Sequence, residues 1–258
     1  MKFIKFLLGF TTLTASVIGF AQNSVDKEWQ HVYDAREAFY EKNIGKLPED
    51  IMKAPKLFGV WPAGGFYVIS ADKIQKGLWV YSTFGLTNSD MPSTLTATDI
   101  EVRHNGQGQV ISSSSKLENK INTKPSLGKA GYGYEVLMLA KENAEWPLWF
   151  MQWTGNIVLL NDVDLLTRVE KNNGLTVEEI PVGNDTNDTI NVLIAKAQKP
   201  LPSGIKLPNG NMQFLVATVI TDEEMQWSMK NGRDALLKKL IDAGVGQISD
   251  RNRSSILK

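Results

Sequence analysis

The feature that most constrains the fold of this chain is the absence of cysteine, which rules out disulfides. This matters because the first residues predict export from the cytoplasm. Exported proteins often gain stability from disulfides in an oxidising compartment. Here an apolar core must hold the fold alone. Aromatic residues for that core are plentiful, with 7 Trp, 10 Phe and 6 Tyr in the whole chain. We therefore expect one domain over residues 22–258.

The first 21 residues have the features of a secretory leader. Lys2 and Lys5 give a positive start, an apolar stretch covers residues 6–20, and small residues end at Ala21. We therefore predict cleavage after Ala21 and a periplasmic or secreted mature protein. The apolar run is shorter than the ~20 residues that span a bilayer, and a lipoprotein anchor needs a cysteine. We expect no membrane anchor after leader removal.

The charge balance is even, with 28 basic and 28 acidic residues. A nearly neutral surface does not attract polyanions strongly. We therefore expect no nucleic acid and no anionic membrane surface as the main partner.

Helical periodicity predicts a helix over residues 25–43, in which Val32, Arg36 and Tyr40 share one side. A second helix is expected from Pro147, because proline is tolerated at the first helical position. Near the end of the chain, Thr221 and Glu224 have the spacing of a capping box.

The capping box predicts a helix from residue 222 to Asp242 with a break near Gly232. Segments rich in β-branched and aromatic residues predict the strands. These cover residues 66–70, 78–84, 100–103, 109–113, 132–140, 175–178, 190–195 and 212–220. The Ser112–Ser115 run is expected to be an exposed loop. Strands alternating with helices predict an α+β domain.

The sequence predicts no catalytic residue. A cysteine nucleophile is impossible, and no G-x-S-x-G elbow supplies a serine. His31 lies on the polar side of the first helix, and His104 lies in a turn-like segment. The GYGYEV motif at residues 131–136 lacks the third glycine of a dinucleotide site and begins a strand, so we predict no cofactor.

Two segments carry side chains that suit calcium, residues 161–164 (NDVD) and 184–188 (NDTND). Neither continues with the glycine and distal glutamate of an EF-hand loop. Solvated turns are the better interpretation, because Asn and Asp favour turns. We predict no metal site.

Three ordered segments resemble the suppressor of fused (SUFU) domain family. Residues 78–88 (LWVYSTFGLTN) look like the family's aromatic strand and its T/S-[FY]-G-L-[ST] turn. Residues 131–153 (GYGYEVLMLAKENAEWPLWFMQW) are similar to its G-[FY]-G-[FY]-E-L strand, W-P step and aromatic helix. Residues 211–240 match a strand of the F-L-x-x-V type that leads into T-x-E-E and a helix. The resemblance covers about residues 55–257.

The resemblance implies an α+β SUFU-like domain with a mixed or antiparallel sheet flanked by helices and no catalytic activity. Animal members bind and hold a transcription factor, and bacterial members are thought to be immunity proteins that neutralise toxins. It therefore implies a protein partner, such as a toxin or effector.

The motif positions nearest loops are candidate binding residues: Tyr81, Gly85, Leu86, Tyr132, Tyr134, Glu135 and Trp146. Trp61, which stands next to a proline outside these motifs, is a further candidate. Most of them also have a structural interpretation. Tyr81 and Tyr134 lie in mid-strand, where aromatic residues pack inward, and Gly85 permits a turn conformation. Glu135 must be paired, or exposed at an edge and functional. Trp61 and Trp146 are the candidates for exposed aromatic anchors.

Two alternatives remain open at this stage, a cell-envelope protein that binds a small ligand and a periplasmic hydrolase. The hydrolase would use paired carboxylates such as Glu178 and Glu179. Adjacent residues of a regular strand point to opposite faces, so this pair is not expected to share a substrate. A deep polar pocket would favour either alternative, whereas a broad exposed patch would favour a protein partner.

Overall fold

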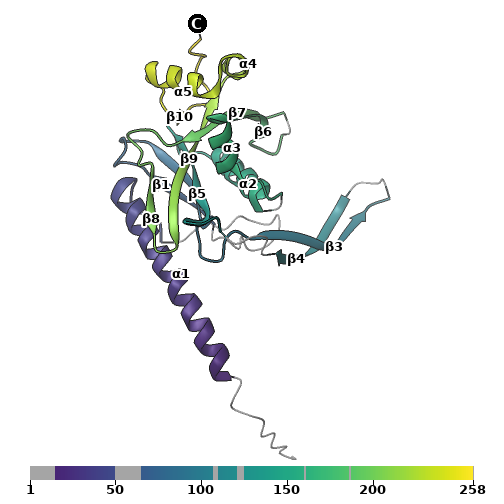
Figure 1. The fold of residues 1–258 in the computed structure, drawn as a ribbon. Helices are drawn as coiled ribbons and strands as arrows, with labels where there is room; N and C mark the ends of the chain where they lie inside the picture. The colour runs from purple at the N-terminus through teal and green to yellow at the C-terminus, as the bar shows by residue number, and fades with distance from the viewer. Residues whose placement is uncertain are drawn as a thin grey trace, which may run out of the picture.

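The computed structural model describes residues 15–49, 65–106, 110–120, 125–159, 161–185 and 187–257 (Figure 1). Within these residues the helices are α1 (Ala15–Asn43), α2 (Trp146–Leu159), α3 (Leu165–Asn172), α4 (Asp222–Asn231) and α5 (Arg233–Asp242). The strands are β1 (Gly65–Ser70), β2 (Trp79–Phe84), β3 (Thr94–His104), β4 (Val110–Lys120), β5 (Lys129–Ala140), β6 (Leu175–Pro181), β7 (Thr189–Lys196), β8 (Gly204–Leu207), β9 (Gly210–Ile220) and β10 (Ile248–Ser249).

An eight-stranded sheet forms the centre of the domain. Its main strand order is β1-β2-β5-β9-β7-β6, with β10 beside β5 and β8 beside β9. The β5–β9 and β5–β10 pairs are parallel, and the other pairs are antiparallel. This mixed sheet with flanking helices confirms the predicted α+β class.

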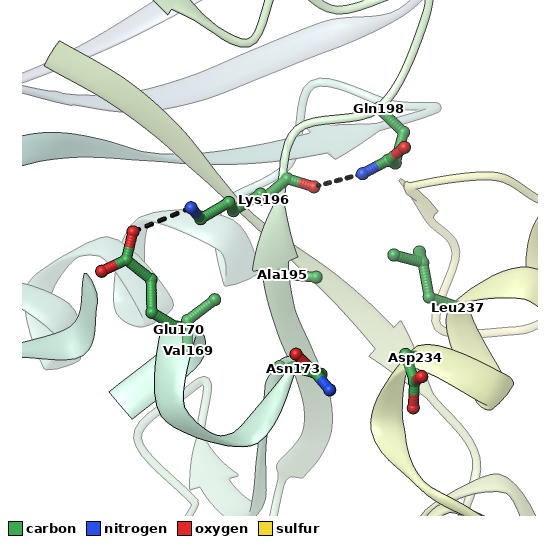
Figure 2. Close-up of a pocket in the computed structure, with 9 residues that line it drawn as sticks. Val169, Glu170, Asn173, Ala195, Lys196, Gln198, Asp234 and Leu237 are labelled. Carbon is green, nitrogen blue, oxygen red and sulfur yellow. Dashed lines mark hydrogen bonds and ion pairs between the residues drawn. The ribbon is translucent and has the colours of Figure 1, made fainter. Parts of the chain in front are cut away.

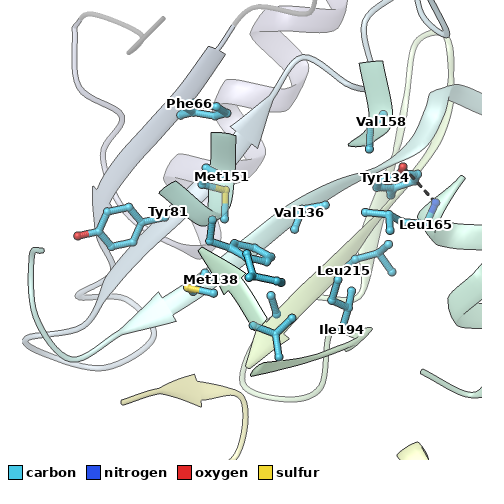
Figure 3. Packing of buried hydrophobic residues seen from close by; sticks show 14 of the residues in the cluster. Phe66, Tyr81, Tyr134, Val136, Met138, Met151, Val158, Leu165, Ile194 and Leu215 are labelled. Atoms are coloured by element: carbon cyan, nitrogen blue, oxygen red, sulfur yellow. Dashed lines mark hydrogen bonds between the residues drawn. The ribbon is translucent and has the colours of Figure 1, made fainter. Parts of the chain in front are cut away.

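Side-chain alternation along β5 separates the two faces of the sheet. Val136 and Met138 belong to an apolar cluster that includes α2 and α3 (Figure 3). Leu137 and Leu139 belong to a second cluster that includes α1. Since successive side chains of a strand point to opposite faces, α1 and the α2–α3 pair cover opposite faces. A third cluster joins Leu193 of β7 to α4 and α5.

Helix α1 begins at Ala15, ten residues before the predicted start at residue 25. Leader segments are apolar and favour helix, so the helix runs on through the predicted cleavage position after Ala21. The predicted inward face is confirmed, because Val32, Arg36 and Tyr40 are all buried. In the part of the chain that the structure describes, no helix has the length and apolar character needed to cross a membrane.

The capping box at the start of α4 is confirmed. The Thr221 side chain accepts from the Glu224 N–H at 3.3 Å, and Glu224 accepts from the Thr221 N–H at 3.0 Å. The predicted break near Gly232 is also confirmed, because α4 ends at Asn231 and α5 begins at Arg233. The Arg253 guanidinium then donates to Glu224 at 2.6 Å, which ties the C-terminal segment to α4.

The hairpin β3–β4 differs from the prediction. Both strands are 11 residues long, and the Ser112–Ser115 run lies inside β4 rather than in a loop. The physical reason is pairing: Ser112, Ser113 and Ser114 stand opposite residues 101–103 of β3. Cross-strand hydrogen bonds satisfy the backbone and override the turn preference of serine. The hairpin extends away from the main sheet (Figure 1).

Three short elements were not predicted: α3, β8 and β10. Helix α3 is capped by Asp164, whose side chain accepts from the Thr167 N–H at 3.0 Å. Strands β8 and β10 have four and two residues. Such strands exist only through pairing with a neighbour, which a local pattern does not reveal.

Candidate functional site

Glu135 of β5 is fully buried and lies at the centre of a polar network. Its Oε1 accepts from the N–H groups of Gly85 and Thr87, each at 3.0 Å, and from the Thr87 hydroxyl at 2.7 Å. Its Oε2 accepts from the Thr83 hydroxyl at 2.6 Å. The first and second family-like segments therefore meet at one carboxylate. Glu135 was predicted to be either paired or exposed at an edge of the sheet, and the structure shows that it is paired.

Arg36 of α1 supplies the positive charge of this network. It is fully buried, and its Nη1 lies 3.4 Å from Glu135 Oε1. The guanidinium also donates to Thr87 Oγ1 at 2.8 Å and to Asn88 Oδ1 at 2.7 Å. It lies over the Phe84 ring, 4.1 Å from the centroid. Burial lowers the pKa of Arg36, and the Glu135 carboxylate opposes that shift.

Neighbouring hydrogen bonds extend the network around the turn after β2. The Tyr40 and Ser82 hydroxyls lie 2.8 Å apart, and Asn209 donates to the Thr87 carbonyl at 2.9 Å. Burial raises the pKa of Tyr40 well above its ordinary value, so the hydroxyl stays neutral. Because Arg36, Glu135 and Thr87 are buried, the network fixes α1 and the turn after β2 on the sheet and offers no reactive group of these residues to solvent.

Three predicted binding residues are buried in the core: Tyr81, Leu86 and Tyr134. The core interpretation of Tyr81 and Tyr134 is confirmed, and both appear in Figure 3. The Tyr81 hydroxyl donates to the Ala144 carbonyl at 2.8 Å and accepts from the Ala144 N–H at 2.7 Å. It thereby fixes the segment before α2. Buried side chains of this kind do not contact a partner in this conformation.

Gly85 and Tyr132 hold the turn and the start of β5 together. Gly85 has a φ of 152° that directs its N–H toward Glu135, which confirms its turn role. The Tyr132 N–H donates to the Leu86 carbonyl at 2.9 Å. The half-buried Tyr132 hydroxyl donates to the Ser93 carbonyl at 2.8 Å.

The prediction that Trp146 is an exposed anchor is wrong, because only 7 % of this residue is exposed. It is the first residue of α2 and packs into the apolar cluster of that helix. Its Nε1 donates to Glu142 at 3.4 Å, and the Arg251 guanidinium lies 5.7 Å from its ring. Trp61 lies outside the described residues.

Glu178 and Glu179, the carboxylates considered for a hydrolase, do not lie in a regular strand as predicted. The β6–β7 register shifts between Val177 and Ile180, so Glu178 and Glu179 both lie in a β-bulge rather than in a regular strand. Glu179 has a φ of 55°, and its N–H donates to Asn191 Oδ1 at 2.9 Å. The opposed-face reasoning does not apply at such a bulge.

Of the two segments that were considered for calcium, the one at Asp185 has the hydrogen bonding of the predicted turn, whereas the one at Asp164 forms a helix cap that was not predicted. Asp164 caps α3, and Asp185 Oδ1 accepts from the Asn187 N–H at 2.9 Å. Among the described residues, no group of three or more His, Cys, Asp or Glu side chains is placed to hold a metal ion.

A surface cavity of about 610 Å³ lies beside the end of β7, where α3 and α5 approach each other (Figure 2). Its walls carry both charged and apolar side chains, and Ala195 and Leu237 are among the apolar ones. Lys196 pairs with Glu170 across 2.8 Å, and Gln198 donates to the Lys196 carbonyl at 3.3 Å. Part of the polar surface is therefore already satisfied within the protein.

Sequence reasoning missed the partners of Glu135. A signal was present, because Arg36 stands among apolar residues on the inward face of α1. A charge on such a face requires a buried counter-charge. Thr83, Gly85 and Thr87 could not be assigned to Glu135, since the sequence does not place these residues beside β5.

The fold is an α+β domain, and the family-like segments at residues 78–88 and 131–153 supply the buried contacts of its polar network. The family profile of Suppressor of fused protein (SUFU) matches residues 65–254. The chain belongs to the SUFU family, in agreement with the resemblance predicted over about residues 55–257. None of the proteins with curated descriptions matches the chain.

Several solved structures resemble the chain. Drosophila Suppressor of Fused is 16% identical with a TM-score of 0.41, over 69% of this chain and 39% of that protein. A structure of the Sufu–Fu complex gives 16% identity and a TM-score of 0.49, over 89% of this chain and 92% of the other. A protein described as a SUFU homologue, from Neisseria gonorrhoeae FA 1090, is 15% identical to this chain with a TM-score of 0.49. The match covers 90% of this chain and 98% of the other. This chain thus spans 39% of the length of the Drosophila protein.

Proposed function

We propose that this chain is a protein-binding domain that acts outside the cytoplasm and neutralises a toxin or another effector. Membership of the SUFU family supports a binding role, since a Sufu protein has been crystallised in complex with Fu. The leader predicted over residues 1–21 supports export. Cleavage after Ala21 leaves Arg36 and Tyr40 in the mature chain, so the buried network survives maturation.

The β3–β4 hairpin is the observation that carries the binding role. Within the described residues the two strands form a sheet of their own. An isolated two-stranded hairpin is only marginally stable in water. Its two outer edges offer backbone donors and acceptors to a further strand. An extended segment of a partner can satisfy these groups by strand addition.

The chemistry of the buried network also favours binding over catalysis. Glu135 accepts three hydrogen bonds from the turn after β2 and one from Thr83 of β2, and it faces Arg36 in a fully buried site. A general acid or base must reach the proton that it transfers. A carboxylate enclosed in this way stabilises the fold and does not meet a substrate.

A shortened hairpin tests this function. Thr96 and Glu118 stand opposite each other, so an Asn-Gly turn joining them directly closes a short hairpin. We expect the mature protein to bind a toxic protein from the extracytoplasmic fraction of its own cells and to suppress its toxicity. The shortened variant should keep the thermal unfolding midpoint and lose both activities. Full binding by the shortened variant would contradict the proposal. The control is Met229→Gln, a change at an exposed residue of α4.

Binding of a small ligand in the cell envelope is the second candidate. The cavity of about 610 Å³ between α3, β7 and α5 favours it, because its size lies within the usual range for ligand sites. Thermal-shift measurements with charged and neutral metabolites test this candidate, and Lys196→Gln should abolish any shift that depends on this cavity. A shift that Lys196→Gln leaves unchanged would place the ligand elsewhere.

A further inference from the structure

A second cavity, of about 210 Å³, lies where three separate segments of the fold meet. The turn after β1, the segment that follows β7 and the connection between α5 and β10 form its walls. Six of its thirteen lining residues are aliphatic, and they come from the three segments and from β5: Ile74, Leu139, Leu201, Ile241, Val245 and Ile248. We name this cavity the α5–β10 pocket.

Several polar groups in the wall of the α5–β10 pocket are paired within the protein. Gln247 is 7% exposed, its Oε1 accepts from the Gln198 N–H at 2.7 Å, and its Nε2 donates to the Lys196 carbonyl at 3.2 Å. The N–H groups of Val245 and Gly246 both donate to the Leu240 carbonyl, at 2.9 and 3.0 Å. These groups are therefore already satisfied within the protein, which leaves the aliphatic side chains of the wall as the main contacts for a ligand.

The mouth of the pocket is apolar as well. Ile241 of α5 lines the mouth and is 44% exposed. Within the part of the chain that the structure describes, it is one of three exposed large hydrophobic residues. Lys199 is the charged residue in the lining, and it is exposed. Apolar surface at a concave mouth gains free energy when a ligand removes it from water.

The size of the pocket sets the size of its ligand. An engineered apolar cavity of about 150 Å³ in another protein stays dry and binds benzene. From the volume, the aliphatic walls and the satisfied polar groups, we infer that the α5–β10 pocket binds one uncharged apolar group, either an aromatic ring or a branched aliphatic chain. This inference does not depend on the proposed function. The group is either a free small molecule or a side chain of a peptide.

Binding of small probes to the full chain, followed by NMR shifts of the pocket residues, tests the inference. Toluene should bind saturably, and methylpyrazine, of similar shape but polar, should bind about tenfold more weakly because its nitrogens lose water without a new partner. N-acetyl-phenylalaninamide and N-acetyl-leucinamide distinguish the sources. If either capped residue binds, a peptide side chain can fill the pocket; if toluene alone binds, the ligand is a free molecule.

Two variants connect the shifts to the pocket. Val245→Phe fills the cavity and should weaken toluene binding about tenfold or more. Ile241→Gln changes only the exposed rim, so it should fold normally and weaken binding about threefold. Met229→Gln, at a 63% exposed residue outside the pocket, should leave binding unchanged. The inference is overturned if toluene gives no saturable shift, if methylpyrazine binds as tightly, or if both pocket variants bind like the unmodified protein.

Discussion

Replacing Arg36 with methionine should destabilise the domain by about 3–5 kcal/mol, the usual cost of breaking a buried ion pair. Methionine keeps an apolar stem against Phe84 but leaves Glu135 without its buried positive charge. It also removes the charged donors to Thr87 and Asn88. In a domain of this size the midpoint of thermal unfolding should fall by roughly 6–20 °C.

Urea unfolding, followed by tryptophan fluorescence and circular dichroism, measures this change. The Arg36→Met and Glu135→Gln variants should each lose stability, and the double variant should lose about 1–3 kcal/mol less than their sum. Arg168→Met, at an exposed arginine of α3, should stay within about 0.5 kcal/mol of the unmodified protein. An Arg36→Met variant within 1 kcal/mol of the unmodified protein, or strictly additive losses, would refute the reasoning.

Two further predictions concern the backbone and pH. Gly131 has a φ of 52°, and an added Cβ would lie 2.4 Å from the Leu86 carbonyl oxygen. Gly131→Ala should therefore lower the free energy of unfolding in urea by more than about 1 kcal/mol. Gly106→Ala is the control and should cost less, because a Cβ at Gly106 meets nothing within 4 Å. Burial opposes ionisation of Glu224, but the hydrogen bonds from Arg253, Ile256 and Thr221 outweigh it and lower its pKa. The contribution of Glu224 to stability is therefore present above its ordinary value of 4.5 and is lost as pH falls through the lower folded value. The stability difference between the unmodified protein and Glu224→Gln should shrink in acid, and a difference that grows below pH 4.5 would contradict this sign.

The sequence predicted those elements whose signal is local. The capping box at Thr221, the aromatic strand that became β2 and the inward face of α1 are visible in neighbouring residues. The SUFU family was also predictable from three ordered motifs. Elements that depend on pairing with distant residues were not predicted. The serine run of β4 forms a strand because β3 stands opposite it, and β10 has only two residues beside β5.

The candidate site was predicted in part. Glu135 was recognised because a carboxylate in an apolar strand needs a partner. Its partner Arg36 lies 99 residues away in the chain, and only the fold brings the two together. Trp146 was misjudged because a tryptophan beside a proline looks like a loop residue, whereas it packs into the core at the first turn of α2.

Because the proposed function assigns partner binding to the β3–β4 hairpin, this hairpin is the surface to probe first. Ser113 and Ser114 pair with Val102 and Glu101 of β3, so a photoreactive amino acid placed at either position probes the hairpin. The same group at Lys171, an exposed residue of α3, serves as the control. On irradiation in the producing cells, we expect one protein to cross-link from the hairpin and not from position 171, and that protein should be toxic when expressed alone. Equal cross-linking from all three positions, or none from the hairpin, would contradict the account.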